Sequence, residues 1–210
     1  MNGVPVIGMG RHRIGVDGIG VTTLVAFHGC PLRCRYCLNP KCLESPEGLP
    51  HYTPEELYRK VGIDNLYFIA TGGGVCFGGG EPLLRTDFLR EFKALCGKSW
   101  NLTLETSLNV PQEAVTEAAE VAGDFIVDIK ESNPDIYHAY TGGDARRAWD
   151  NLQYLMALVG ADHITVRVPL IPEFNTEADT ARTVERLLAM GVSKIDRFTY
   201  RTSNHSDTSR

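Results

Sequence analysis

Short apolar segments alternate with amphipathic segments along most of this chain, and no other feature of the sequence constrains the fold as strongly. The apolar segments resemble buried strands, and helix-like spacing follows most of them. We expect strands at residues 21–27, 75–77, 102–106, 125–129, 164–168 and 195–200, and helices at 53–60, 87–96, 111–122, 145–158 and 176–190. Strands that alternate with helices predict an α/β fold with a parallel sheet, either open or curled into a partial barrel.

Local capping signals define several of the expected helix ends. Thr53 and Glu56 form a capping-box pattern around a proline, which begins the first helix. Thr86 is a candidate cap for the second helix, and Gly191 is expected to end the last one. The segment 65–74 combines apolar residues with glycines, and we expect a loop there that returns to the sheet.

The composition indicates one soluble, cytoplasmic domain. The chain has 210 residues, of which 43% are hydrophobic, and this is enough for a single well-buried core. We expect the core domain at 1–203 and a polar tail at 204–210. The net charge of -5 gives no general case for nucleic-acid binding. The first residues lack the apolar run of a signal peptide or membrane helix.

Three of the six cysteines, Cys30, Cys34 and Cys37, lie within eight residues, directly after the first expected strand. Parallel α/β folds bind ligands beyond the carboxyl ends of their strands. Without a secretory signal, such crowding indicates metal ligation rather than disulfides. Three thiolates on a [4Fe–4S] cluster would leave one iron open to a substrate or cofactor.

Two other interpretations of these cysteines remain open. A structural zinc ion needs a fourth ligand, which His28 or Cys42 could supply. The cysteines could also be inert buried residues, although this spacing on one loop favours ligation. We expect Cys76 and Cys96 to belong to the hydrophobic core.

Further polar motifs follow later strands. Residues 78–82 read Gly-Gly-Gly-Glu-Pro; this could be an ordinary tight turn, and it lacks the Lys-Ser/Thr ending of a phosphate loop. Glu105, Asp128, Lys130 and Arg167 lie at or near strand ends. Each could be a cap or an ion-pair partner, but isolated buried charges are costly. Their shared position therefore favours a polar site.

The segment CPLRCRYC at 30–37 matches C-x-x-x-C-x-aromatic-C, the signature of the radical S-adenosylmethionine (SAM) superfamily, and 78–82 resembles its G-G-E-P motif. Four more stretches resemble the glycyl radical enzyme activating enzymes, typified by the pyruvate formate-lyase activase. They are Val-Asp-Gly-Ile-Gly at 16–20, Glu-Thr-Ser at 105–107, Asp-Ile-Lys at 128–130 and Arg-Val-Pro-Leu-Ile-Pro at 167–172.

The resemblance implies a partial (β/α)6 radical SAM barrel and an oxidoreductase-type enzyme that reductively cleaves SAM to a 5'-deoxyadenosyl radical, which removes a glycine Cα hydrogen from a partner. The cluster is expected on Cys30, Cys34 and Cys37. The implied cofactor contacts are Tyr36 at the adenine; Gly79, Gly80 and Glu81 at the methionine amino group; Lys130, Arg167 and Val168 around the carboxylate and ribose; and Glu105, Thr106, Asp128 and the Ile126 carbonyl around a possible monovalent cation.

The implied partners are a glycyl radical enzyme and an external electron donor such as flavodoxin or ferredoxin, with no nucleic acid and no membrane. Some residues depart from the family pattern: Ile19 replaces a proline, Glu173 replaces a common glycine, and Arg201 stands where a histidine is usual. Two alternatives follow: a radical SAM enzyme acting on a small molecule, peptide or RNA, and a non-catalytic iron–sulfur or zinc protein.

Overall fold

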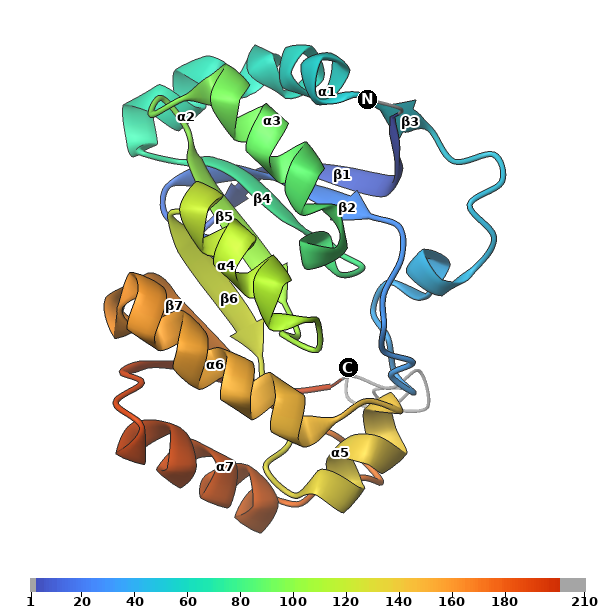
Figure 1. Cartoon of the computed structure of the whole chain (residues 1–210), viewed down its shortest axis with the longest axis vertical. Coiled ribbons are helices and arrows are strands. Elements are labelled where there is room, and N and C mark those ends of the chain that lie inside the picture. Colours follow the sequence, from blue (N-terminus) through green and yellow to red (C-terminus); the bar gives the residue numbers. More distant parts are fainter. Residues whose placement is uncertain (1–2, 201–210) are drawn as a thin grey trace, which may run out of the picture.

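One eight-stranded sheet organises the computed structural model, which describes residues 3–200 (Figure 1). The strands are β1 (Val4–Ile14), β2 (Val21–Phe27), β3 (His51–Tyr52), β4 (Gly74–Gly79), β5 (Asn101–Thr106), β6 (Asp124–Asp128), β7 (Ile164–Leu170) and β8 (Lys194–Thr199). The α-helices are α1 (Pro54–Val61), α2 (Asn65–Thr71), α3 (Thr86–Cys96), α4 (Gln112–Val121), α5 (Pro134–Thr141), α6 (Ala145–Val159) and α7 (Glu177–Ala189). Short 3-10 helices are η1 (Pro40–Leu43), η2 (Gly62–Asp64), η3 (Pro82–Arg85) and η4 (Ala161–His163).

The sheet order is β3-β1-β2-β4-β5-β6-β7-β8. From β2 to β8 the neighbouring strands are parallel and follow chain order, whereas β1 and β3 are antiparallel additions at one edge. β3 and β8 are therefore open edges, and the sheet does not close. The expected partial barrel of six parallel strands is confirmed.

The two faces of the sheet differ in chemistry. On β5, Leu102 and Leu104 are fully buried in the main hydrophobic core, while Glu105 points to the opposite face. The helices follow one another along the core side of the sheet in Figure 1. The parallel register places Glu105 beside Ile126 and Asp128 beside Arg167. Polar residues of neighbouring strands consequently meet on the face away from the main core.

Two segments differ from the expectations. Residues 65–71 form α2 rather than a loop. Gly72 adopts a left-handed conformation, which ends this short helix, and Phe68 is the buried residue of α2. Thr86 is not the cap of α3; it is the first helical residue, and its hydroxyl donates to Glu117 at 2.5 Å. The capping box of Thr53 and Glu56 is present as expected.

Strands β1 and β3 and helix α5 are additional to the expected elements. Across residues 3–200, none of the helices combines the length and apolar character that crossing a membrane requires. The tail at 204–210 and Arg201 lie outside the described residues.

Candidate functional site

The three cysteines of the CPLRCRYC segment lie on the loop that follows β2, at the carboxyl end of the parallel strands. This loop is held against α5: the backbone N–H of Arg33 donates to Thr141 at 2.8 Å, and that of Arg35 donates to Tyr140 at 3.1 Å. The N–H of Cys37 donates to the carbonyl of Cys34 at 3.2 Å. The backbone thus holds all three thiols in one short turn.

The thiols of this loop differ in their environments. Cys30, Cys34 and Cys37 are partly exposed, whereas Cys42 in η1 is buried. A hydrogen bond from the Cys42 thiol lowers the pKa of Cys37 to about 6 and also lowers the pKa of Cys30. Burial raises the pKa of Cys34 to about 11. The N–H of Gly29 donates to the carbonyl of Cys42 at 3.0 Å, so η1 lies against the start of the cysteine loop.

The donor set fits an iron–sulfur cluster better than a single metal ion. Within residues 3–200, no three His, Cys, Asp or Glu side chains converge on one ion-sized point. His28, a candidate zinc ligand, is instead hydrogen-bonded to the carbonyl of Glu44 at 2.9 Å. The thiolates around a cubane each bind a different iron, so they surround a volume rather than one point. Three partly exposed thiols on one turn are compatible with that arrangement.

The glycine-rich turn after β4 lies directly against the cysteine loop. The N–H of Gly80 donates to Phe27 at 2.9 Å, and the N–H of Glu81 donates to Gly29 at 2.8 Å. Gly79 has a φ of 83°, and a Cβ atom on Gly80 would overlap the Gly29 carbonyl oxygen. Only glycine lets these two backbones approach so closely, so the turn brings residues 79–81 next to Cys30.

Glu81 is 1% exposed and is bound on both carboxylate oxygens. Oε1 accepts from the Thr106 hydroxyl at 2.7 Å, and Oε2 accepts from Ser107 twice, from its N–H at 2.9 Å and its hydroxyl at 2.7 Å. Burial raises the pKa of Glu81, and these hydrogen bonds partly offset that effect. In this structure the carboxylate joins the ends of β4 and β5.

Two ion pairs lie on the polar face of the sheet. Arg167 donates to Glu105 at 2.8 Å, and Lys130 donates to Asp128 at 2.9 Å. Burial raises the pKa of Glu105, while Arg167 acts against that shift. Burial lowers the pKa of Lys130, but Asp128 and its other neighbours raise it more, so the net pKa lies well above the usual value. Both expected carboxylates of the cation site are thus already paired with protein cations.

An aromatic cluster borders the cysteine loop. Tyr140 and Tyr200 are buried in it, and Tyr36 and Phe174 pack against them together with Cys34. The Tyr36 hydroxyl donates to Glu173 at 2.7 Å, and this bond raises the pKa of Tyr36. The expected adenine-binding side chain therefore already lies among aromatic neighbours.

Comparison with known proteins decides the family. The model of the Radical SAM superfamily matches residues 24–187. A pyruvate formate-lyase-activating enzyme of Clostridium pasteurianum is 30% identical over 89% of this chain and 78% of the relative. A pyruvate formate-lyase 1-activating enzyme of Escherichia coli K12 is 30% identical over 88% of this chain and 76% of the relative. The chain belongs to the radical SAM superfamily.

More distant similarities agree with this assignment. A (2S)-3-sulfopropanediol dehydratase activating enzyme of Klebsiella oxytoca is 27% identical over 77% of this chain and 69% of the relative. The crystal structure of Streptococcus suis SuiB bound to S-adenosylmethionine superposes with a TM-score of 0.64 at 13% identity, covering 87% of this chain and 43% of SuiB. That likeness shows a shared fold. As a radical SAM enzyme, the protein is a catalyst of radical generation, and the non-catalytic alternatives no longer apply.

Burial limits what several residues of this radical SAM protein can contact. The side chain of Val168 belongs to the main core, so only its backbone can face a ligand. Asp17, in the Val-Asp-Gly-Ile-Gly stretch, is buried and forms an ion pair with Arg13. Cys76 and Cys96 are both buried, as expected. Cys96 belongs to the main core, whereas Cys76 lies on the opposite face of β4 from Val75 and Phe77 and pairs with Thr103.

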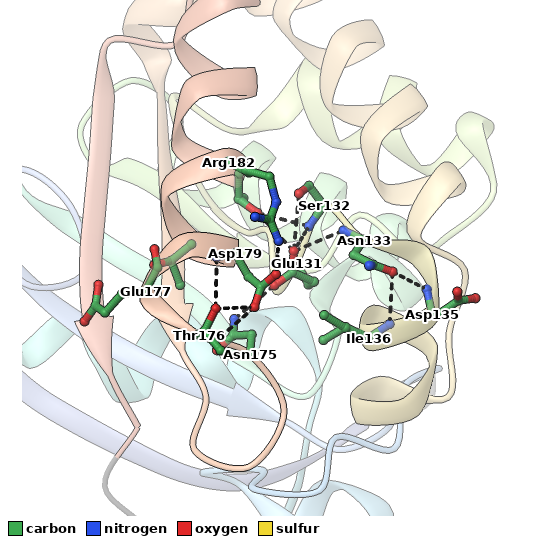
Figure 2. A network of polar contacts seen from close by, with 12 residues as sticks. Glu131, Ser132, Asn133, Asp135, Ile136, Asn175, Thr176, Glu177, Asp179 and Arg182 are labelled. Carbon is green, nitrogen blue, oxygen red and sulfur yellow. Dashed lines mark hydrogen bonds and ion pairs between the residues drawn. The ribbon is translucent and has the colours of Figure 1, made fainter.

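Sequence reasoning missed the polar network that holds the loops around the site (Figure 2). Buried Glu131 follows Lys130 and accepts from the N–H groups of Ser132 and Asn133 at 2.7 and 3.0 Å and from the Asn175 amide at 3.1 Å. Asn175 also accepts from the N–H of Ile171 at 2.6 Å. The network ties the loop after β6 to the loop after β7, which carries Glu173 and Phe174. A Glu directly after Asp-Ile-Lys was the available signal.

Proposed function

We propose that this radical SAM enzyme activates a glycyl radical enzyme by removing a Cα hydrogen from one glycine of its partner. The observation that carries the proposal is the contact between the cysteine loop and the glycine turn, made by Gly80 and Glu81, at the mouth of an open sheet. The relatives above are named as activating enzymes of pyruvate formate-lyase and of a dehydratase. An open barrel edge suits a catalyst that must admit a loop of a large protein.

Cys30, Cys34 and Cys37 would hold the [4Fe–4S] cluster, and Tyr36, the backbone of Gly79 and Gly80, Lys130 and Arg167 would hold SAM. When bound, the cluster and SAM together supply a one-electron cleavage that yields methionine and a 5'-deoxyadenosyl radical. The residues of this chain would orient SAM and exclude water from it. The glycine turn would offer backbone atoms to the amino group of SAM, and Lys130 would offer positive charge to its carboxylate.

A monovalent cation near Glu105, Thr106, Asp128 and the Ile126 carbonyl completes the proposed site. The carboxylate of SAM would add negative charge beside Glu105 and Asp128. The positive charges of Lys130 and Arg167 already pair with these two carboxylates, so neither is left to balance the carboxylate of SAM. Like charges at close range raise one another's pKa unless a further cation intervenes.

An external donor such as flavodoxin or ferredoxin is the proposed source of the electron, in the cytoplasm. Arg33, Arg35 and Lys41 are exposed around the cysteine loop, and none of them forms an ion pair within the described part of the chain. This unpaired positive charge, on a chain with a net charge of -5, would attract an acidic carrier to the cluster.

The test uses the full chain, reconstituted with iron and sulfide without oxygen and reduced with dithionite. With SAM and a genomically adjacent candidate partner, we expect 5'-deoxyadenosine, methionine and a glycine-centred doublet in the electron paramagnetic resonance spectrum. Deuterium from Cα-labelled glycine should appear in the 5'-deoxyadenosine. Cys34→Ala should abolish the cluster, whereas Cys96→Ala serves as the matched control. SAM cleavage without a glycyl radical on any candidate would favour a small-molecule, peptide or RNA substrate.

A further inference from the structure

Glu173 has a backbone conformation that seldom suits a glutamate. It follows Pro172 in the turn after β7, where the N–H of Phe174 donates to the carbonyl of Ile171 at 3.1 Å, as in a type II turn. The φ angle of Glu173 is 69°, in the left-handed region that the third residue of such a turn requires. Glycine adopts this conformation without strain, so a glutamate here costs free energy that a glycine would avoid.

Buried hydrogen bonds hold the rest of this turn in place. Asn175 is 8% exposed, and its side chain accepts from the N–H of Ile171 at 2.6 Å and donates to the carbonyl of Pro169 at 3.1 Å. The same amide donates to buried Glu131 at 3.1 Å, within the network of Figure 2. None of these bonds uses the side chain of Glu173, so the shape of the turn does not explain why a glutamate stands there.

Within residues 3–200, two other non-glycine residues have a positive φ angle, and the contacts of each account for it. Leu108, with a φ of 54°, is fully buried in the main core, and the ring of His12, with a φ of 55°, is hydrogen-bonded to Asp64 at 2.9 Å. Glu173, by contrast, is exposed. In the part of the chain that the structure describes, the only hydrogen bond of its side chain is the one that its Oε2 accepts from the Tyr36 hydroxyl, at 2.7 Å.

Tyr36 belongs to the cysteine loop and meets the turn after β7 at two points. Its ring packs edge to face on Phe174, with 5.9 Å between the ring centroids, and lies 6.3 Å from the ring of Tyr140. Its hydroxyl is bound by Glu173, and among the described residues it has no other hydrogen-bond partner. Two successive residues of one turn therefore hold the ring and the hydroxyl of Tyr36.

We propose that Glu173 is a positioning residue, which holds the Tyr36 ring in the orientation that contacts the adenine of SAM. A hydrogen bond to a carboxylate is stronger than one between neutral groups, and it offsets the cost of the left-handed backbone. A side chain that is fixed before SAM arrives loses less conformational freedom when SAM binds, so the affinity is higher. The inference rests on the proposed contact of Tyr36 with SAM, and not on which partner the enzyme activates.

The experiment compares SAM affinity, measured by calorimetry on the cluster-loaded full chain, with the unfolding of the cluster-free chain in urea. Glu173→Gly should weaken SAM binding about fivefold, the loss expected for one hydrogen bond. Its urea midpoint should equal or exceed that of the wild type, because glycine accepts the positive φ angle without strain. Glu173→Gln, whose amide oxygen can still accept from Tyr36, should bind SAM more tightly than Glu173→Gly. Glu185→Gln, at an exposed position of α7, is the control for the loss of a charge.

Tyr36→Phe removes the same hydrogen bond from its other end. SAM affinity should fall as it does in Glu173→Gly, and the double variant should bind SAM no more weakly than either single variant, because both changes delete one interaction. Iron and sulfide are measured first, so that all variants are compared at equal cluster content.

Unchanged SAM affinity in Glu173→Gly would overturn the inference and leave the proposed SAM site intact. Additive losses in the double variant would overturn it as well. So would a Glu173→Gly chain that is less stable than the wild type, which is the result expected of a purely structural residue. No partner protein enters these measurements, so a failure to form a glycyl radical leaves them unchanged. A wild type that binds no SAM would instead refute the proposed cofactor site, and this inference with it.

Discussion

Ser107 donates both its backbone N–H and its hydroxyl to one carboxylate oxygen of Glu81, at 2.9 and 2.7 Å. The other oxygen accepts from Thr106 and, at 3.3 Å, from the N–H of Leu83, the second residue of η3. Glu81 thereby links the turn after β4 to the turn after β5. Two motifs that the sequence presents separately, Gly-Gly-Gly-Glu-Pro and Glu-Thr-Ser, act as one polar unit.

Replacing Glu81 should weaken the fold as well as the site. Glu81→Ala would leave several buried donors without an acceptor, and each such loss costs about 1–3 kcal/mol. Glu81→Gln should restore only part of the lost stability, because the NH2 group of glutamine would face one of the hydrogen-bond donors that Glu81 accepts from. The free energy of unfolding in urea, measured without oxygen, checks the expectation. Glu91→Ala, on the exposed side of α3, is the control; equal losses for Glu81→Ala and the control would contradict it.

Lys130 should matter more for SAM than for stability. Its ammonium group donates to Asp128 and, at 3.0 Å, to the Tyr200 hydroxyl. Tyr200→Phe removes one hydrogen bond and should cost about 1 kcal/mol of stability. Lys130→Met removes the positive charge from Asp128, so SAM affinity should fall about tenfold or more.

Calorimetric titration of the cluster-loaded protein with SAM measures that change. Lys98→Met, at an exposed position, provides the control for loss of a lysine charge. Unchanged affinity in Lys130→Met would remove Lys130 from the proposed SAM site.

The parallel core was predictable because each of its units carries its own local signals. The helix that begins after Thr53, for example, has a complete capping box and a buried Leu57. Helix α2 lacks such signals, since Leu66, Tyr67 and Ile69 are exposed and no apolar stripe faces the core. Strand β1 was also missed, because its glycines and arginines interrupt the apolar pattern that indicates a strand. Its extended conformation depends on pairing with β2.

The candidate site was predictable in its location but not in its contacts. Glu105, Asp128 and Arg167 meet because the carboxyl ends of parallel strands share one edge. Which side chain each of these residues contacts depends on the paths of the loops, and no local sequence pattern encodes those paths. The approach of η1 to the cysteine loop is one example, because it depends on a backbone hydrogen bond from the N–H of Gly29 to the carbonyl of Cys42.

Potassium should strengthen SAM binding if the proposed cation site exists. Glu105 and Asp128 are each paired with a protein cation, so the extra charge is needed only when the SAM carboxylate enters. We expect SAM affinity to rise with potassium at constant ionic strength, and Asp128→Asn to reduce the response. Asp150→Asn, an exposed carboxylate on α6, is the control. If the SAM affinity of the wild type does not change with potassium or sodium, the proposed cation site is wrong, but the radical chemistry is unaffected.

Asp64 should give the fold a pH dependence that is separate from the site. Its buried carboxylate accepts from Arg11 at 2.9 Å and from Thr23 at 3.0 Å, and it contacts His12 at 2.9 Å. The hydrogen bond from Arg11 is the main cause that lowers the pKa of Asp64 to about 2. An unfolded aspartate has a pKa of about 3.9, so folding favours the ionised form. The stabilisation is therefore fully present above about pH 4 and is lost as the pH falls toward 2.

Asp64→Asn should consequently be less stable than wild type by about 1–2 kcal/mol near neutral pH, because Arg11 would lose a charged partner. The difference should shrink between about pH 4 and pH 2, where the wild-type carboxylate takes up its proton. Urea unfolding across this range measures both values, with the exposed Asp87→Asn as control. Arg11→Met should remove most of the same pH dependence, since it deletes the principal donor. A gap between wild type and Asp64→Asn that stays constant down to pH 2 would show that the ionised form of Asp64 is not what folding favours.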